Sequence, residues 1–503
     1  MENESKVVSF IDVGTNSIHI LVVRFFEGSM GTPIFQDKES VWLGESLFKH
    51  GFIDSGTIEK ARIVLSNFVK ISKDLGAERI LAYATCAARE ASNRQELLDA
   101  LRIEDVEVKI ISGLEEARLT RLGIFGPNGP PQKTLEIDIG GGSTEIILCE
   151  GSEDLFLDSL SLGSVRLAFD PDQSRALTFQ EYDFLRRHVD RMSYRTCNKV
   201  REIGFEKAYG SSGTMIALAK MCAARRDGDS SYMMYDELVE VMTELYTKNT
   251  EERKGVLGMT PSRSRIIVSG GAIAEELMYL FGIDRIEIST NGLKQGMEID
   301  YLITNGHSDF NIRDSSVLNL ANRCRYDKLH AETVQRNALH LFDEMKRLGI
   351  HNMNSNTRML LSYASLLHDI GEFISFPKHH LHSYIIILNS FLPGFDNEEL
   401  RAMALMTRFH HGKFPRDRSK RFRDMGESRS SDILVCAMML RIADVLDRHR
   451  NSSVDAIKVS ASSDEVTICL CSESDVSMEM WRLDTIKDDF KAVFGRDLKT
   501  CGP

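Results

Sequence analysis

The chain has 503 residues, of which 42% are hydrophobic and 27% charged, and its formal net charge is −12. This composition is typical of globular proteins, and the acidic balance argues against general binding to nucleic acid or to anionic membranes. No apolar run reaches the roughly 18 residues that a membrane-spanning helix needs, and the N-terminus lacks the basic and apolar regions of a signal peptide.

The first part of the chain, up to about residue 300, alternates between strand and helix patterns. Apolar runs predict strands at residues 7–14, 18–28, 78–85, 106–113, 134–142 and 144–151, with a helix at 94–102. Residues 207–224 and 265–282 each predict a strand, a glycine loop and a helix. Strands that alternate with helices indicate an α/β architecture.

The pattern changes near residue 310. From there to about residue 450 almost every segment has the helical period, which predicts an all-α domain. The last 50 residues or so alternate again and end in a predicted helix. We therefore expect four parts, which are lobes at 1–125 and 126–305, an all-α domain at 306–450 and a small α+β domain at 451–503.

Two segments of the first part are near-repeats of each other. SFIDVGTNSIHILVV (residues 9–23) and LEIDIGGGSTEIILC (residues 135–149) share an Ile-Asp-x-Gly frame that leads into a second strand. Each predicts a hairpin whose turn is rich in small residues. Two such hairpins suggest two related α/β lobes that face each other across a cleft.

The small residues of the two turns are candidates for binding phosphate. A tight turn of this kind exposes backbone N–H groups on one side, and such a nest binds phosphate oxygens. Neither turn has the Lys of a Walker A loop or opens a helix as a dinucleotide fingerprint does. The candidates are Gly14, Thr15, Asn16 and Ser17 in the first turn and Gly140, Gly141, Gly142, Ser143 and Thr144 in the second.

Acidic residues flank the same turns. Asp138 ends a strand just before the glycines, Glu145 begins the returning strand, and Asp12 has the matching place in the first hairpin. Phosphate chemistry needs a cation to neutralise developing charge, and Mg²⁺ prefers carboxylate oxygens. A turn-stabilising Asp and a solvent-facing Glu are the structural alternatives. We expect Asp12, Asp138 and Glu145 to hold Mg²⁺ or Mn²⁺.

The segment SGLEEARL, from residue 112 to 119, supplies a candidate base. Ser112 and Glu115 fit a helix capping box, which explains Glu115 structurally. Glu116 is turned about 100° further round the helix, and capping does not account for it. It can point into the cleft and deprotonate a water, although an acid in a first helical turn is often only a partner of the helix dipole.

Nine cysteines are scattered along the chain, and none forms a Cys-x-x-Cys pair. This spacing indicates neither a zinc ribbon nor a disulfide framework. Structural disulfides belong to oxidising compartments. We therefore expect a cytoplasmic protein.

Together these motifs resemble the exopolyphosphatase / guanosine pentaphosphate phosphohydrolase family, within the actin-like ATPase and sugar-kinase superfamily. The resemblance rests on IDVGTNSIHILV, ATCAAREASN, SGLEEARL, IDIGGGSTEI, YGSSGTM, VSGGAI and NGLKQG, in that order, and covers roughly residues 7–300. It implies two actin-like, ribonuclease H-like lobes around a cleft.

The resemblance also implies roles for residues. Glu116 would activate water, Asp138 and Glu145 would help to hold Mg²⁺, and Arg89 would lie near the phosphates. The loop that contains Ser212 and Gly213 would close the floor of the cleft. Water would then attack the terminal phosphoryl group in line and release orthophosphate. The sequence departs from the family at Lys294, where an arginine often stands, and a lysine is a point charge rather than a fork.

Histidines gather in the all-α part, where nine of the 14 fall between residues 330 and 411. The order His, His-Asp, His, His, Asp resembles HD-type metal-dependent phosphohydrolases, and imidazole with carboxylate suits a first-row divalent metal. The alternative is a domain that keeps this fold without metal and binds distal polyphosphate. The candidates for a second metal site are His330, His368, Asp369, His410 and Asp444.

A basic run follows these histidines in an otherwise acidic chain. Such a run is usually a solvated loop, but beside a phosphate-handling cleft it can form a channel for a long polyanion. If so, neutralising it should weaken binding of long chains more than hydrolysis of short ones. The channel candidates are Arg416, Arg418, Lys420, Arg421 and Arg423.

Four functions agree with these features. The main hypothesis is a hydrolase that removes terminal orthophosphate from inorganic polyphosphate. The second uses the same site on guanosine pentaphosphate. The third places an HD-type nucleotide phosphohydrolase in the helical domain, and the fourth is a non-catalytic, actin-like nucleotide-binding switch. We expect no nucleic-acid or membrane partner, and relatives of this kind suggest a homodimer.

Overall fold

The computed structural model divides into two compact units, Met1–Ile312 and Arg313–Pro503. The finer division into four domains stays a prediction. No helix within the described part of the chain is long and apolar enough to cross a membrane. The structure describes residues 5–26, 31–103, 106–169, 172–226, 228–305, 311–390, 392–415, 422, 425–450 and 453–502.

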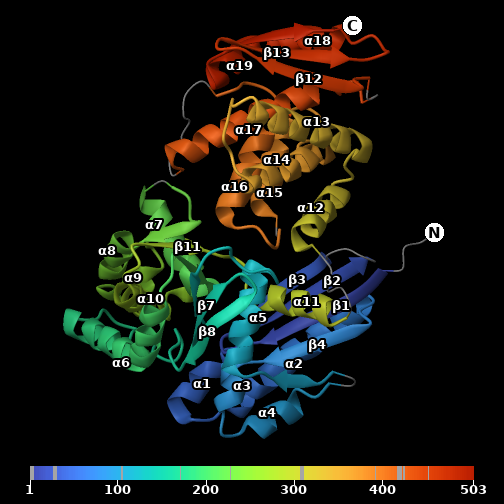
Figure 1. The fold of residues 1–503 in the computed structure, drawn as a ribbon. Coiled ribbons are helices and arrows are strands. Elements are labelled where there is room, and N and C mark those ends of the chain that lie inside the picture. The colour runs from blue at the N-terminus through green and yellow to red at the C-terminus, as the bar shows by residue number, and fades with distance from the viewer. Residues whose placement is uncertain are drawn as a thin grey trace. The chain divides into compact units, whose positions relative to one another are not determined.

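The first unit begins with a five-stranded sheet (Figure 1). Its central strands are rich in Val, Ile and Phe, which favour a pleated, buried surface. β1 pairs antiparallel with β2, and β4 runs parallel to β1. In spatial order the strands are β3 (Thr32–Ser40), β2 (Ser17–Phe26), β1 (Ser5–Val13), β4 (Arg79–Ala84) and β5 (Val108–Ile110).

A second sheet repeats this plan and adds one strand. β6 pairs antiparallel with β7 and parallel with β9, as β1 does with β2 and β4. The near-repeat of the sequence is therefore a repeat of topology. In spatial order the strands are β10 (Tyr232–Met234), β11 (Arg285–Ile288), β9 (Lys207–Ser211), β6 (Thr134–Ile139), β7 (Thr144–Glu150) and β8 (Glu153–Leu160).

Helices pack on both sheets and build a separate apolar core with each. The helices of this unit are α1 (Leu43–His50), α2 (Ser55–Asp74), α3 (Cys86–Glu90), α4 (Arg94–Ala100), α5 (Gly113–Phe125), α6 (Phe179–Ile203), α7 (Ser212–Arg226), α8 (Tyr235–Tyr246), α9 (Thr250–Arg253), the 3₁₀ helix η1 (Pro261–Arg263), α10 (Ile267–Phe281) and α11 (Leu293–Thr304).

Two of these helices, α5 and α11, make an unusually close contact. A Cβ added at Gly296 of α11 would lie 1.8 Å from the carbonyl oxygen of Leu119 in α5, and one added at Gly123 would lie 2.1 Å from that of Gly292. Only glycine allows backbones to approach so closely. α11 also lies on the first sheet, where Tyr301 meets Phe10 at 6.0 Å between ring centroids.

The prediction for residues 265–282 is wrong in one respect. The structure has no strand there; α10 begins at Ile267 and contains both glycines. A short apolar run cannot be assigned to strand or helix by its pattern alone. The glycines serve helix packing, since a Cβ at Gly271 would lie 2.1 Å from the sulfur of Met242 and one at Gly270 2.5 Å from Cγ2 of Thr214.

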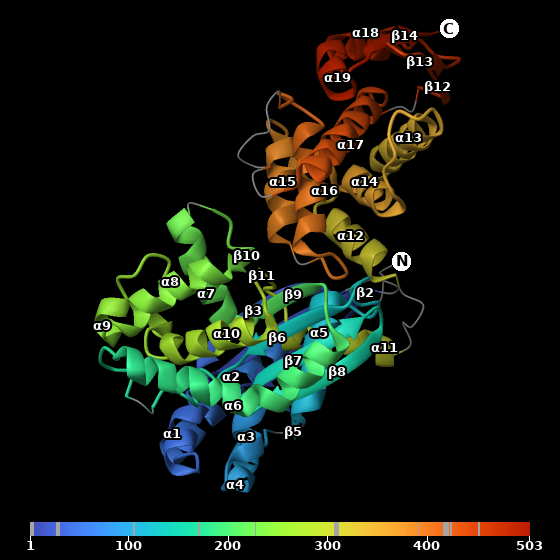
Figure 2. The ribbon, with the colours of Figure 1, turned by 60° about the vertical axis from the view of Figure 1, so that its left-hand side comes forward.

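The second unit contains a helical bundle and a small three-stranded sheet (Figure 2). One continuous apolar core includes residues of both. The helices are α12 (Ile312–Arg323), α13 (Lys328–Arg347), α14 (Ser355–Leu367), the 3₁₀ helix η2 (Ile370–Phe373), α15 (His379–Asn389), α16 (Asn397–Phe409), α17 (Glu427–Val445), α18 (Ser477–Thr485) and α19 (Lys487–Phe494). The strands are β12 (Ala456–Ala461), β13 (Glu465–Cys471) and β14 (Asp497–Cys501).

The C-terminal segment differs from expectation in two ways. The last regular element is β14, which runs parallel to β13, rather than a helix. Cys469 and Cys501 oppose each other in this pair and form a disulfide, although the cysteine spacing predicted no disulfide framework. A pair separated by 32 residues becomes adjacent only through strand pairing, and the sequence pattern alone does not show that pairing.

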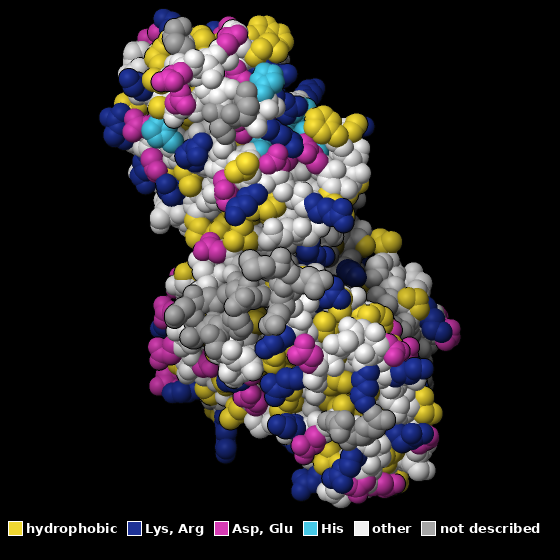
Figure 3. All heavy atoms as spheres, turned by 90° about the vertical axis from the view of Figure 1, so that its right-hand side faces the viewer, with side chains coloured by type: hydrophobic (Ala, Val, Ile, Leu, Met, Phe, Trp, Pro, Cys, Tyr) yellow, Lys and Arg dark blue, Asp and Glu magenta, His cyan; other side chains and the backbone are white. Residues whose placement is uncertain are grey.

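The surface mixes charges of both signs. On the face drawn in Figure 3, Lys and Arg side chains are interspersed with Asp and Glu side chains. The basic run at residues 416–423, apart from Phe422, lies outside the described residues, so the channel built from Arg416, Arg418, Lys420, Arg421 and Arg423 stays a prediction.

Candidate active site

The two predicted hairpin turns have the same geometry and lie against each other. The backbone N–H of Gly14 donates to the carbonyl of Ser17 at 3.1 Å, and that of Gly140 donates to Ser143 at 3.0 Å. A Cβ added at Gly142 would lie 2.8 Å from Oγ1 of Thr15. The second turn therefore needs glycine where it meets Thr15 of the first.

Both turns open on a cavity of about 590 Å³ in the first unit. Two predicted residues do not line it: Arg89, and Thr144, whose hydroxyl donates to the carbonyl of Leu162 at 2.8 Å. The cavity does bring together most of the sequence-predicted residues, namely Asp12, Gly14, Thr15, Asn16, Ser17, Glu116, Asp138, Gly140, Gly141, Gly142, Ser143, Glu145, Ser212 and Gly213.

Strand pairing places two of the acids side by side. Asp138 of β6 is the register partner of Glu145 in β7, and Ser159 donates to Glu145 Oε1 at 2.8 Å. Burial raises the pKa of Glu145 to about 7, and the charge of Asp138 adds to the effect. Burial also raises the pKa of Asp138 to about 6, against hydrogen bonds from serines that lower it. Both acids are held where ionisation is costly.

Asp12 has the corresponding position in the first hairpin, opposite His19. Its Oδ1 is buried without a hydrogen-bond partner among the described atoms. Burial raises the pKa of Asp12 to about 7, although the cation of Lys294 lowers it and Asp138 raises it further. An unpaired carboxylate oxygen among other acids fits a divalent cation.

Glu116 projects from the first turn of α5 into the same cavity. Ser112 caps this helix by accepting from the N–H of Glu115 at 3.1 Å, while the Glu115 side chain pairs with Arg118 instead of completing a capping box. Burial, and then the charge of Glu145, raises the pKa of Glu116 well above its usual value, against the charge of Arg89. Arg89 lies 3.4 Å from Glu116, so it holds the acid rather than lining the cavity.

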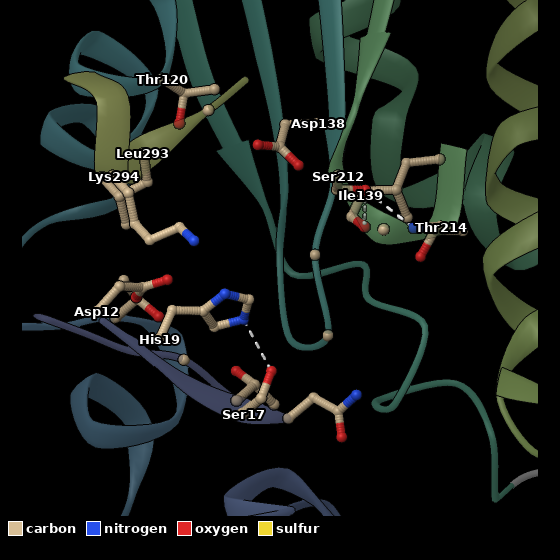
Figure 4. A pocket seen from close by; sticks show the side chains of 18 of the residues that line it. Asp12, Ser17, His19, Thr120, Asp138, Ile139, Ser212, Thr214, Leu293 and Lys294 are labelled. Carbon is tan, nitrogen blue, oxygen red and sulfur yellow. Dashed lines mark hydrogen bonds between the residues drawn. The ribbon is translucent and has the colours of Figure 1, made fainter. Parts of the chain in front are cut away.

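Three cations line the cavity that were not among the predicted site residues: Lys38, Arg263 and Lys294. Figure 4 shows the Lys294 side chain directed toward Asp12 and His19. Burial lowers the pKa of Lys294 and that of Arg263. Lys38 and Arg263 stand in no recognisable motif. Lys294 lies in NGLKQG and could have been found from that segment.

His19 was also missed. Its Nε2 lies 2.9 Å from Oγ of Ser17 (Figure 4). Burial, followed by the cations of Lys294, Lys38 and Arg263, lowers the pKa of His19 to about 3. The ring is therefore neutral. The equivalence of His19 with Glu145 in the two hairpins is the signal that could have revealed it.

The backbone is strained at Ser212, which lies at the floor of the cavity. Ser212 has φ +82°, a conformation that costs non-glycine residues of the order of 1–3 kcal/mol. Its hydroxyl donates to the carbonyl of Ile139 at 2.7 Å. A Cβ at Gly213 would lie 1.7 Å from the guanidinium of Arg263, so glycine is needed for that cation to reach the cavity.

The second unit gathers the predicted histidines and acids. Asp369 Oδ2 lies 3.6 Å from Nε2 of His330 and 3.5 Å from Nε2 of His368. Its Oδ1 lies 3.4 Å from Nε2 of His410, and Asp444 Oδ1 lies 3.6 Å from Nε2 of His330. All five predicted residues thus meet. His379, 3.3 Å from Asp369, was not among the predicted ligands.

Comparison with known proteins assigns the chain to a family. The model of the Ppx/GppA phosphatase family matches residues 21–304, which is more than half of the chain. The chain belongs to the Ppx/GppA phosphatase family. The model of domain III of these phosphatases matches residues 312–485. The chain is therefore a hydrolase that acts on phosphoanhydride bonds, and the predicted fold class is confirmed.

Individual relatives agree with this assignment. A guanosine-5'-triphosphate,3'-diphosphate pyrophosphatase of Aeromonas hydrophila is 28% identical over 477 residues, 93% of each chain. One of Vibrio vulnificus is 26% identical over 471 residues, 93% of this chain and 92% of its own.

Solved structures share the fold. An exopolyphosphatase of Cytophaga hutchinsonii has a TM-score of 0.55 at 24% identity, over 60% of this chain and 98% of its own. A Ppx/GppA family member of Aquifex aeolicus has a TM-score of 0.51 at 22% identity, over 60% of this chain and 100% of its own.

Proposed function

We propose that the cleft removes terminal orthophosphate from inorganic polyphosphate. The observation that carries this proposal is the lining of the cavity, which combines two hairpin turns of small residues and the cations of Lys38, Arg263 and Lys294 with five acids. Among the described residues that line it there is no Phe, Tyr or Trp on which a nucleobase could stack. Nests and cations recognise phosphate without reading a base.

Glu116 is the general base of this proposal. It takes a proton from a water, and the oxygen of that water forms a bond to the terminal phosphorus. The bond from phosphorus to the bridging oxygen breaks, and the shortened chain leaves with the electron pair on that oxygen. A raised pKa makes Glu116 a stronger base than an exposed carboxylate, and Arg89 at 3.4 Å keeps it oriented.

The acids of the hairpins fit a divalent ion. Asp12, Asp138 and Glu145 would hold Mg²⁺ or Mn²⁺, because three carboxylates crowd into a buried space and Oδ1 of Asp12 has no other partner among the described atoms. The ion would neutralise charge on the phosphate oxygens. Ser212 and the two turns orient the chain end, and Thr15 and Gly142 fix the separation of the turns.

Guanosine pentaphosphate is the second candidate substrate. The relatives named above are guanosine-5'-triphosphate,3'-diphosphate pyrophosphatases, and the chain matches them along almost their whole length. The same base and nests would act on its 5'-terminal phosphate. The homodimer implied by the family resemblance stays a prediction.

Parallel assays distinguish the substrates. Orthophosphate release is measured with Mg²⁺ from long-chain polyphosphate, guanosine pentaphosphate and ATP. We expect the highest kcat/KM with polyphosphate. A higher value with guanosine pentaphosphate would reverse the substrate assignment, and ATP binding without release from any substrate would indicate the non-catalytic switch.

A further inference from the structure

Four histidines of the second unit are held in one tautomer by their surroundings. Nδ1 of His368 faces the carbonyl of Ser365 at 2.7 Å, that of His379 faces Phe376 at 3.1 Å and that of His410 faces Thr407. Nδ1 of His330 faces Asp447 Oδ2 at 2.8 Å. Carbonyl and carboxylate oxygens only accept hydrogen bonds, so each Nδ1 carries the proton and each neutral ring offers a lone pair at Nε2.

These lone pairs point at one another in two pairs. Nε2 of His330 lies 3.3 Å from Nε2 of His368, and Nε2 of His379 lies 3.2 Å from Nε2 of His410. Two acceptors at this distance repel each other unless a cation lies between them. The rings are buried, so water screens this repulsion poorly.

Asp369 joins the two pairs. Its Oδ2 lies within 3.6 Å of His330 and His368, and its Oδ1 lies within 3.4 Å of His379 and His410. Asp444 is buried, and its Oδ1 has no hydrogen-bond partner among the described atoms while it faces His330 at 3.6 Å and His368 at 3.8 Å.

We propose that these residues form a binuclear centre for two first-row divalent ions, with Asp369 as the bridging ligand. One ion takes His330, His368, Asp369 Oδ2 and Asp444. The other takes Asp369 Oδ1, His379 and His410, with positions left for exogenous ligands. The centre goes beyond the single site expected from sequence and is independent of the function proposed for the cleft.

The spacing of the donor atoms fits this assignment. Bonds of about 2.0–2.2 Å to nitrogen and oxygen put neighbouring ligands of one ion roughly 2.8–3.6 Å apart. The pairs above fall mostly within that range before any ion is bound. The ligand set of imidazole and carboxylate favours Mn²⁺, Fe²⁺ or Zn²⁺ over Ca²⁺.

The exogenous ligand is a phosphate oxyanion. Two divalent ions carry more positive charge than Asp369 and Asp444 neutralise, so the loaded centre attracts an anion. Arg448 lies 3.4 Å from Asp444, and Arg450 lies 3.0 Å from Asp369 Oδ2 and is partly exposed. Two-metal sites of this kind clamp phosphate oxygens.

Metal stoichiometry tests the centre directly. The full-length chain is stripped with a chelator, dialysed against Mn²⁺ and analysed for metal. Relative to wild type, Asp369→Asn should lose two ions and His379→Ala one. His340→Gln is the matched control, because His340 lies on α13 with His330 but bonds to the carbonyl of Ile457 at 2.7 Å, and it should lose none.

Electron paramagnetic resonance of the wild type requires no variant. A carboxylate-bridged Mn²⁺ pair should give an exchange-coupled multiline spectrum, and added orthophosphate should change it. A spectrum of uncoupled Mn²⁺ alone, or a wild-type metal stoichiometry in Asp369→Asn, would overturn the binuclear centre. Protons shared between the paired histidine rings would then be the cations that offset their repulsion. A coupled spectrum that orthophosphate does not change would overturn the assigned ligand.

Discussion

The acids of the cleft show how burial sets the chemistry of a single residue. Asp12, Asp138 and Glu145 keep contact with the cavity, yet burial raises the pKa of each to between about 6 and 7. Burial limits the hydration that could stabilise three carboxylates so close together. A bound cation, or protons at lower pH, must neutralise them.

This arrangement predicts how metal and pH affect stability. An acid whose folded pKa is raised binds protons in the folded state that the unfolded state has released, so between about pH 4 and 7 stability falls as pH rises. The metal-free chain should therefore lose stability from pH 5 to 8. Mg²⁺ should raise Tm more at pH 8 than at pH 5, because at pH 8 the three carboxyl groups carry few protons that the ion must displace.

Thermal unfolding of wild type and Asp12→Asn/Asp138→Asn at both pH values checks this prediction. The histidines of the second unit also titrate, so the difference between the two proteins is the quantity to compare. An equal rise in Tm with Mg²⁺ in both proteins, or an equal rise at both pH values in the wild type, would contradict the assigned ion site.

At the scale of elements, the contact between α5 and α11 positions the helix that bears Glu116. Gly296 and Gly123 allow the two helices to touch backbone to backbone. Gly296→Ala would put its Cβ 1.8 Å from the carbonyl of Leu119. Neither backbone can move without shifting its helix, so we expect a loss of about 1–3 kcal/mol of unfolding free energy.

Urea unfolding measures this loss, with Gly56→Ala in the first turn of α2 as control. The nearest atom to a Cβ at Gly56 is Oδ1 of the Asp54 side chain at 3.2 Å, and alanine is the better helix former. The control should be neutral or stabilising. A Gly296→Ala chain as stable as wild type would show that the helices can separate at no cost.

Sequence reasoning succeeded where interactions are local. The hairpins, the cap at Ser112 and the glycine-rich turns follow from neighbouring residues, and most predicted cleft residues do line one cavity. It failed where distant segments meet. It missed Arg263 and Lys38 in the lining of the cavity, the pairing of Cys469 with Cys501, and the contact of His379 with Asp369. The repeated Asp-x-Gly frame could locate the cleft because both lobes of the first unit contain it. A single Lys or Arg outside any motif gives no comparable sequence signal.

At the scale of the whole molecule, two units each gather groups suited to phosphate chemistry. The first offers carboxylates, nests and cations around one cavity. The second offers histidines around Asp369. Because both can serve a hydrolase, the central claim is that polyphosphate is cleaved at Glu116 and not at the histidines.

One measurement tests this claim most directly. Orthophosphate release from long-chain polyphosphate with Mg²⁺ is followed for wild type, Glu116→Gln and His368→Ala/Asp369→Ala, each checked for folding by circular dichroism. Loss of a general base typically costs about 10²–10⁴ in rate, so release should collapse in Glu116→Gln and persist in the double variant. Retained release in Glu116→Gln, with loss in the double variant, would place the reaction in the second unit and contradict the account.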